Sequence, residues 1–172
     1  MRVVLVPGLT ASTWTMGPLH NRLEAEGFEC YAPGFETQTG VHGELDKLAR
    51  TLREIGPAVV VGHSLGGLQA IILALADNPH MLGVVGLGTP ILGWVHPRVP
   101  YFEARSITDG LLPLWGPTEL KRFCTLHVLL AFDGGVHNWV VEKLQYIQKL
   151  HDWEDDLRSF GRDADLQVGG ER

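Results

Sequence analysis

The chain has 172 residues, of which 45% are hydrophobic and 20% are charged, with 21 glycines and 10 prolines. This length and composition suit one domain with a packed core, and they exclude the disordered, collagen-like and disulfide-scaffold classes. The formal net charge is −6, and residues 151–172 contribute −4 of it through seven acids and three bases. The rest of the chain is therefore close to neutral. It offers no basic patch, so we expect no nucleic-acid partner.

The N-terminal stretch Met1–Gly8 is too short for the apolar region of a signal peptide and runs directly into turn residues. We therefore expect a cytoplasmic protein, although a chain whose leader had been removed would look the same. The longest apolar stretch, 65–76, is far short of a membrane span, so we expect no transmembrane segment. Cys30 and Cys124 could pair or stay reduced, and they say little about the redox compartment. The sequence leaves the oligomeric state open.

Short β-rich runs alternate with helical patterns along the chain. The β-rich runs predict strands at 2–6, 28–32, 58–61, 83–87, 102–107 and 125–132. The helical patterns predict helices at 17–26, 43–55, 65–76 and 139–157. This alternation predicts an α/β fold of about six mostly parallel strands with helices on both faces. We expect a single domain over residues 1–160 and a polar C-terminal tail over 161–172.

Residues Gly62-His63-Ser64-Leu65-Gly66 form the pattern G-x-S-x-G between the strand predicted at 58–61 and the helix predicted at 65–76. A serine at such a tight strand-to-helix turn adopts a strained backbone, so its neighbours must be very small. Its hydroxyl is then exposed above the sheet, and the helix N-terminus beneath it adds positive potential. We therefore predict that Ser64 is a nucleophile rather than an ordinary N-cap serine.

The order of strand, G-x-S-x-G and helix resembles the α/β-hydrolase superfamily, and Gly62–Gly67 is similar to its lipase and esterase members. The opening Val3–Leu9 resembles the first strand and oxyanion turn of that family, with Pro7-Gly8 where most lipases have His-Gly. The resemblance covers about residues 2–150 and extends to the small bacterial lipases without a lid. It implies a minimal α/β-hydrolase fold. Because Gly88–Tyr101 is too short for the helical cap of many relatives, we expect no cap domain.

A nucleophilic serine needs a base and a third group that orients the base, and in this family they follow in the order Ser, acid, His. His137 lies in the turn 133–138, after the last predicted strand and before the last predicted helix, where the family places its base. We therefore expect His137 to be the base. His127 falls inside the apolar run Leu126–Leu130, and we expect it to be a strand residue with a local partner.

Asp109 is the expected acid. It lies in a loop directly after the strand predicted at 102–107, and this segment resembles the family's segment around the acid. Asp133, four residues before His137, is the alternative acid. Asp109 could instead be a turn former, a common use of aspartate before glycine.

Two backbone N–H groups are expected to hold the oxyanion of the tetrahedral intermediate. One belongs to Leu65, directly after the nucleophile. The other belongs to Leu9, whose place after Pro7-Gly8 matches the second donor of the family. No metal ion and no cofactor are expected.

Several tryptophans fall in or near loops at the expected catalytic end of the sheet. We predict that three of them line an apolar substrate site, and ordinary packing beneath the loops is the alternative. The three are Trp14, Trp115 and Trp139.

These features together predict a serine hydrolase of the carboxylesterase or lipase type that acts on a small-molecule or lipid ester. Ser64 attacks the carbonyl, His137 acts as base, and Asp109 orients His137, so that an acyl-enzyme forms and water then releases the acyl group. A thioesterase or amidase with the same triad is an alternative. A non-catalytic ligand-binding homologue is another, because a fold does not fix a function.

Overall fold

The computed structural model describes all residues except 9–12, 35–39, 92, 110–113 and 169–172. Its main element is a six-stranded sheet in which all neighbouring strands are parallel. In spatial order the strands are β2 (Glu29–Tyr31), β1 (Arg2–Val6), β3 (Ala58–His63), β4 (Met81–Leu87), β6 (Tyr101–Ser106) and β8 (Glu119–Phe123). The chain adds one strand beside β1, then crosses back and builds the rest of the sheet on its other side. This is the winding of open α/β sheets, which bind ligands at the carboxyl ends of their strands.

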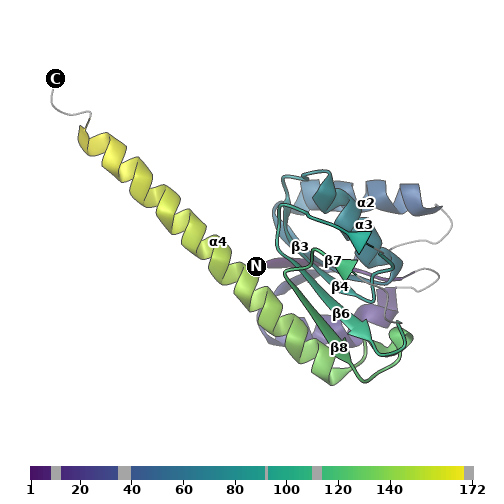
Figure 1. The fold of residues 1–172 in the computed structure, drawn as a ribbon. Coiled ribbons are helices and arrows are strands. Elements are labelled where there is room, and N and C mark those ends of the chain that lie inside the picture. The colour runs from purple at the N-terminus through teal and green to yellow at the C-terminus, as the bar shows by residue number, and fades with distance from the viewer. Residues whose placement is uncertain (9–12, 35–39, 92, 110–113, 169–172) are drawn as a thin grey trace.

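Helices cover both faces of this sheet (Figure 1). Helices α1 (Gly17–Ala25) and α4 (Gly134–Val168) pack on one face, and α2 (Gly40–Ile55) and α3 (Leu65–Leu75) pack on the other. A one-turn helix, η1 (Thr13–Met16), leads into α1. A small second sheet pairs β5 (Gly93–Trp94) with β7 (Leu114–Trp115).

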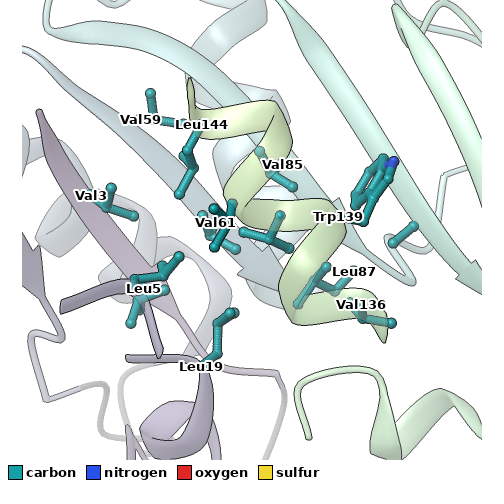
Figure 2. Packing of buried hydrophobic residues seen from close by; sticks show 14 of the residues in the cluster. Val3, Leu5, Leu19, Val59, Val61, Val85, Leu87, Val136, Trp139 and Leu144 are labelled. Carbon is teal, nitrogen blue, oxygen red and sulfur yellow. The ribbon is translucent and has the colours of Figure 1, made fainter. Parts of the chain in front are cut away.

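The central strands are apolar on both sides, as expected for strands that helices cover on both faces. In β1, Val3 and Leu5 belong to the core beneath α1 and α4, whereas Val4 and Val6 belong to the core beneath α2 and α3. All four side chains are fully buried. Each contributes about 1.5–3 kcal/mol of hydrophobic free energy relative to an exposed position. Figure 2 shows the first of these cores, in which Leu19, Val136, Trp139 and Leu144 pack against side chains from β1, β3 and β4.

Five of the six predicted strands are confirmed within a few residues, but the strand predicted at 125–132 is wrong. The last strand is β8, and the predicted segment contains instead the one-turn helix η3 (His127–Leu129). The reason lies in the position of β8 at the edge of the sheet, where three of its five residues are exposed. An edge strand with one solvent-facing side does not need the continuous apolar run by which a central strand is recognised.

Helix α4 is longer than the helix predicted at 139–157 and spans 35 residues. It begins at Gly134 because Asp133 caps it, with Asp133 Oδ1 accepting the backbone N–H of Val136 at 3.0 Å. Its first half packs on the sheet, and its second half projects past the sheet and continues into the segment predicted as a tail (Figure 1). The domain boundary at residue 160 stays a prediction. None of the described helices has both the length and the apolar character needed to cross a bilayer.

Candidate active site

Ser64 occupies the single residue between β3 and α3. Its backbone φ is +51°, a conformation that residues with a side chain rarely adopt. The glycines on either side leave no room for a Cβ atom. A Cβ on Gly62 would lie 2.4 Å from the backbone nitrogen of Gly67, and one on Gly66 would lie 2.4 Å from the carbonyl oxygen of Val6. The strained strand-to-helix turn predicted around Ser64 is therefore confirmed.

The turn after β1 lies beside Ser64. A Cβ atom on Gly8 would lie 3.2 Å from the Cβ of Ser64 and 3.2 Å from Nδ1 of His63. Leu65 is the first residue of α3, so its N–H belongs to the unpaired donors at a helix N-terminus. Leu9, the other predicted oxyanion donor, lies outside the described residues.

A carboxylate and an imidazole meet at the carboxyl ends of β6 and β8. Asp109, in the turn after β6, places its Oδ1 atom 2.6 Å from Nδ1 of His127. The other oxygen of the carboxylate accepts the backbone N–H of Ser106 at 2.7 Å, which fixes the orientation of the group. The Asp109 side chain is 10% exposed and that of His127 is 34% exposed. The acid is thus shielded from water while the imidazole remains accessible.

Two further contacts connect this pair to the serine turn. The backbone N–H of Ser64 donates to the carbonyl oxygen of Leu87 at 2.8 Å, and a Cβ atom on the next residue, Gly88, would lie 2.6 Å from the His127 ring. The backbone of Leu87 and Gly88 therefore contacts both the Ser64 turn and the His127 ring. In addition, His63 Nε2 lies 3.0 Å from the carbonyl oxygen of His127. Burial lowers the pKa of His63, although the hydrogen bond to the carbonyl oxygen of His127 opposes this effect.

A pocket of about 280 Å³ opens beside Asp109 and His127. Its other walls are Gly88, Thr89, Pro90, Ile91 and Arg105. These residues belong to β6 and to the segment that joins β4 to β5. In open parallel sheets this edge is where ligands bind, so the pocket is a candidate site for part of a substrate.

Comparison with known proteins identifies the family of the chain. The sequence model of the Alpha/beta hydrolase family matches residues 3–168. The chain belongs to this family. No curated protein matches it.

Three solved structures illustrate the likeness of this alpha/beta hydrolase to known folds. A monoacylglycerol lipase from Paleococcus ferrophilus has a TM-score of 0.68 at 17% identity, over 85% of this chain and 94% of the other. A methylesterase from Arabidopsis also has a TM-score of 0.68, at 12% identity, over 85% and 99% of the two chains. A lipase-esterase related protein from Clostridium acetobutylicum has a TM-score of 0.64 at 15% identity, over 85% and 93%. At these identities the likeness shows the fold.

The histidine that the sequence favours lies elsewhere in this alpha/beta hydrolase. His137 is in the first turn of α4, is 7% exposed, and its Nε2 atom donates to the carbonyl oxygen of Ala131 at 2.8 Å. The structure therefore brings Asp109 together with His127 and not with His137. Asp133, the alternative acid, accepts the N–H of Val136 as the cap of α4.

One signal in the sequence could have pointed to His127. The family places its base after the last strand and before the last helix, and His127 lies four residues beyond the end of β8. The apolar run 126–132 has the pattern of a buried strand, so the sequence alone places His127 within the last strand rather than after it. In the structure Leu130 and Ala131 are buried, whereas Leu126, Val128 and Leu129 are exposed.

The three tryptophans predicted to line a substrate site have different surroundings. Trp139 is 2% exposed in the core beneath α4, and its indole N–H donates to Glu119 at 2.9 Å, so it is a packing residue and not a site residue. Trp14, in η1, is 72% exposed. Trp115 lies in β7, in register with Trp94 of β5.

Cysteines and groups of metal-ligating side chains are two other possible sources of chemistry among the described residues. Cys30 and Cys124 are both free. Burial, together with the negative charge of Glu24, raises the pKa of the Cys30 thiol to about 11, so it is a weak nucleophile. Within the described part of the chain, no group of three His, Cys, Asp or Glu side chains is arranged to hold a metal ion.

Proposed function

We propose that this chain is a serine hydrolase that cleaves carboxylic esters through an acyl-enzyme on Ser64, with His127 as the base. The observation that carries the proposal is the 2.6 Å contact between Asp109 Oδ1 and His127 Nδ1, on the same edge of the sheet as the strained Ser64 turn. A carboxylate on Nδ1 holds the ring proton there and leaves Nε2 as the basic nitrogen. His127 thus takes the role that the sequence suggests for His137.

The reaction follows from these roles. Nε2 of His127 removes the hydroxyl proton of Ser64 while Oγ attacks the ester carbonyl, and Asp109 stabilises the resulting imidazolium. The tetrahedral intermediate collapses as the imidazolium returns the proton to the leaving alcohol, which leaves the acyl group on Ser64. Water, deprotonated by the same imidazole, then attacks this acyl-enzyme and releases the carboxylic acid.

The oxyanion is held by backbone N–H groups. The N–H of Leu65, the first residue of α3, is proposed as one donor, and the N–H of Leu9 as the second because Gly8 lies against Ser64. Each such donor is worth roughly 3 kcal/mol of transition-state stabilisation. The helix dipole of α3 acts in the same direction.

The substrate class is proposed from the kind of protein that shares this fold. The similar structures include a lipase and a methylesterase, and their names support an ester as the first class to test. We propose a small-molecule or lipid ester whose acyl or alcohol part occupies the pocket lined by Ile91 and Arg105.

The direct test is covalent labelling with a fluorophosphonate, followed by intact mass measurement. The wild-type chain is expected to gain one adduct, and Ser64→Ala is expected to gain none. Ser159→Ala is the matched control, because Ser159 is exposed on α4 and its hydroxyl donates to the carbonyl oxygen of Asp156 in the same helix. This variant should be labelled like the wild type. No adduct on the wild type, or an equal adduct on Ser64→Ala, would overturn the nucleophile assignment.

A second measurement addresses the bond that is cleaved. A series of p-nitrophenyl esters of increasing acyl length is expected to be hydrolysed, with Ser64→Ala inactive on all of them. If labelling succeeds but thioesters or amides are cleaved and esters are not, the triad holds and the substrate class is wrong. If no acyl compound is turned over, the ligand-binding alternative replaces the enzyme.

A further inference from the structure

Three polar side chains lie side by side on β6, on the face of the sheet that α2 and α3 cover. Tyr101, Glu103 and Arg105 alternate along the strand and so share one face of the sheet. They are 1%, 0% and 3% exposed, respectively. The Tyr101 hydroxyl donates to Glu103 Oε2 at 2.6 Å, and Arg105 Nε lies 3.9 Å from Glu103 Oε1. The proposed proton transfers and nucleophilic attack use none of these groups, and Arg105 also lines the pocket beside His127.

Glu103 and Arg105 both hydrogen-bond to one backbone segment, Gly88–Ile91. Glu103 Oε1 accepts the backbone N–H of Thr89 at 2.7 Å. A single nitrogen of Arg105 donates to the carbonyl oxygens of Thr89 and Ile91, at 3.1 and 3.0 Å. These three bonds, together with the backbone bond from the N–H of Gly88 to the carbonyl oxygen of Ala104 at 2.7 Å, hold the segment after β4 against β6.

The same segment forms a wall against the imidazole of His127. Gly88 has φ +68° and a backbone so close to the ring that an added Cβ would lie 2.6 Å from Cε1 and 2.7 Å from Nδ1 of His127. Nδ1 is the atom that faces Asp109. If the Gly88 backbone moved, it would either collide with the His127 ring or leave a gap beside that ring.

We propose that Glu103 and Arg105 are positioning residues that fix Gly88–Ile91 and thereby hold the His127 ring in line with Asp109. This inference rests on the proposed function, because it assigns the two residues to the base of that reaction. Their chemistry fits the role. Guanidinium is a rigid planar donor that can hold two carbonyl oxygens at once, and a buried carboxylate accepts a backbone N–H more strongly than a neutral group does.

Burying the charges of Glu103 and Arg105 costs free energy, and their mutual attraction often does not offset that cost. Burial raises the pKa of Glu103 to about 7, although its hydrogen bonds from Tyr101 and Thr89 and the nearby Arg105 oppose this effect. Buried ion pairs can often be replaced by apolar side chains of similar size without loss of stability. Two apolar residues would remove the buried charges, but they would leave the Tyr101 hydroxyl and the Thr89 N–H without their acceptor. The segment 88–91 would lose its three bonds to side chains of β6 and keep the backbone bond from Gly88 to Ala104.

The test is the double variant Glu103→Leu with Arg105→Met, which leaves no unpaired buried charge from this pair. Its unfolding temperature is expected to be lower than that of the wild type, because the Tyr101 hydroxyl and the Thr89 N–H lose their acceptor. At a temperature where both proteins are folded, its kcat on the best p-nitrophenyl ester is expected to fall on the order of 10- to 100-fold, since small misplacement of a catalytic group costs rates of this size. KM is expected to rise as well, because Arg105 lines the proposed substrate pocket, but the positioning role requires the fall in kcat. The conservative variant Glu103→Gln keeps an acceptor for Thr89 and should recover most of the kcat.

The matched control is a second ion pair, outside the segment 88–91. Lys143 Nζ lies 2.6 Å from Glu119 Oε2, between α4 and the edge strand β8. The double variant Glu119→Leu with Lys143→Met should keep the wild-type kcat. If it lowers kcat as much as the β6 variant does, or if the β6 variant keeps kcat and only raises KM, the positioning role is overturned.

A spectroscopic measurement separates this inference from the proposed activity. The Nδ1 proton shared by His127 and Asp109 should give a downfield proton resonance in the resting protein, assigned by its loss in His127→Gln. We expect this resonance to broaden or disappear in the β6 double variant and to persist in the control. An unchanged resonance in the β6 variant refutes the positioning role even if the wild type hydrolyses no ester.

Discussion

His63 Nε2 lies 3.0 Å from the backbone carbonyl oxygen of His127, and the two ring centroids are 5.2 Å apart. The residue directly before Ser64 is thus bonded to the backbone of the proposed base. His63, at the first variable position of G-x-S-x-G, therefore has a structural role in this chain. It ties the turn after β3 to the turn after β8, although the two are more than sixty residues apart in the chain.

Removal of this bond should impair catalysis more than binding. In His63→Leu the carbonyl oxygen of His127 loses one hydrogen bond and keeps that from the N–H of Leu130, at 3.3 Å, so the change costs about 0.5–1.5 kcal/mol. We expect kcat to fall on the order of tenfold, with a smaller change in KM, because the base is less well fixed. His63→Gln can still donate an N–H and should lie much closer to the wild type. Steady-state kinetics of the two variants test this prediction. Equal kcat values for His63→Leu and His63→Gln would contradict it.

Substitution of each of the two candidate histidines distinguishes the structural assignment of the base from the sequence assignment. His127→Gln should lower kcat/KM by roughly 10³-fold or more, as for loss of a triad member. His137→Gln keeps a donor for Ala131 and should cost at most about 1 kcal/mol of stability with little effect on kcat. Ester hydrolysis and urea denaturation measure both effects. Loss of activity in His137→Gln alone would favour His137 as the base.

Any side chain at Gly66, the last glycine of the G-x-S-x-G turn, should destabilise the protein. In Gly66→Ala the new methyl group would meet the carbonyl oxygens of Val6 and Pro7 at 2.4 and 2.6 Å, so α3 must move away from β1. We expect a loss of about 1–3 kcal/mol in the free energy of unfolding, together with lower activity, because Ser64 moves with the helix. Gly17→Ala is the control, since the methyl group added there would have no described neighbour within 4 Å beyond its own helix and the adjacent residues. Equal stability of both variants in denaturant titrations would contradict the close packing.

The buried carboxyl of Glu103 should make stability depend on pH. Burial raises its pKa to about 7 in the folded chain, against an ordinary 4.5 in the unfolded one. Between these values the folded state binds more protons, so the free energy of unfolding falls as pH rises through this window, by on the order of 3 kcal/mol from this group. Below the window both states are protonated, and the group contributes no dependence.

Glu103→Gln removes the titrating group and should flatten this part of the curve. The difference in unfolding free energy between the two proteins isolates Glu103, because His63 and the other titrating groups are present in both. Denaturant titrations across the window should show this difference changing in favour of the variant as pH rises. Parallel curves would mean that Glu103 titrates as an exposed acid does.

The alternation of strands and helices and the serine turn could both be predicted from sequence. Central strands such as β1 and β3 are covered on both faces, so their apolar runs are continuous and recognisable. The turn at Ser64 was predictable because Gly62 and Gly66 are a local steric requirement of one short segment. Asp109 could likewise be placed at the catalytic edge, because it follows a strand directly.

The partner of Asp109 and the place of Trp139 were decided only by the tertiary structure. The strand β8 lies at the sheet edge with a polar sequence, and the apolar run after it predicted a strand in the wrong place. For this reason the sequence favoured His137 as the base, whereas the structure places His127 beside Asp109. Trp139 enters the core because α4 begins at Gly134, directly after its cap Asp133, and turns that face toward the sheet. Local patterns report how much of a segment is buried, whereas the neighbour that buries it, or that accepts its proton, is set by contacts between distant segments.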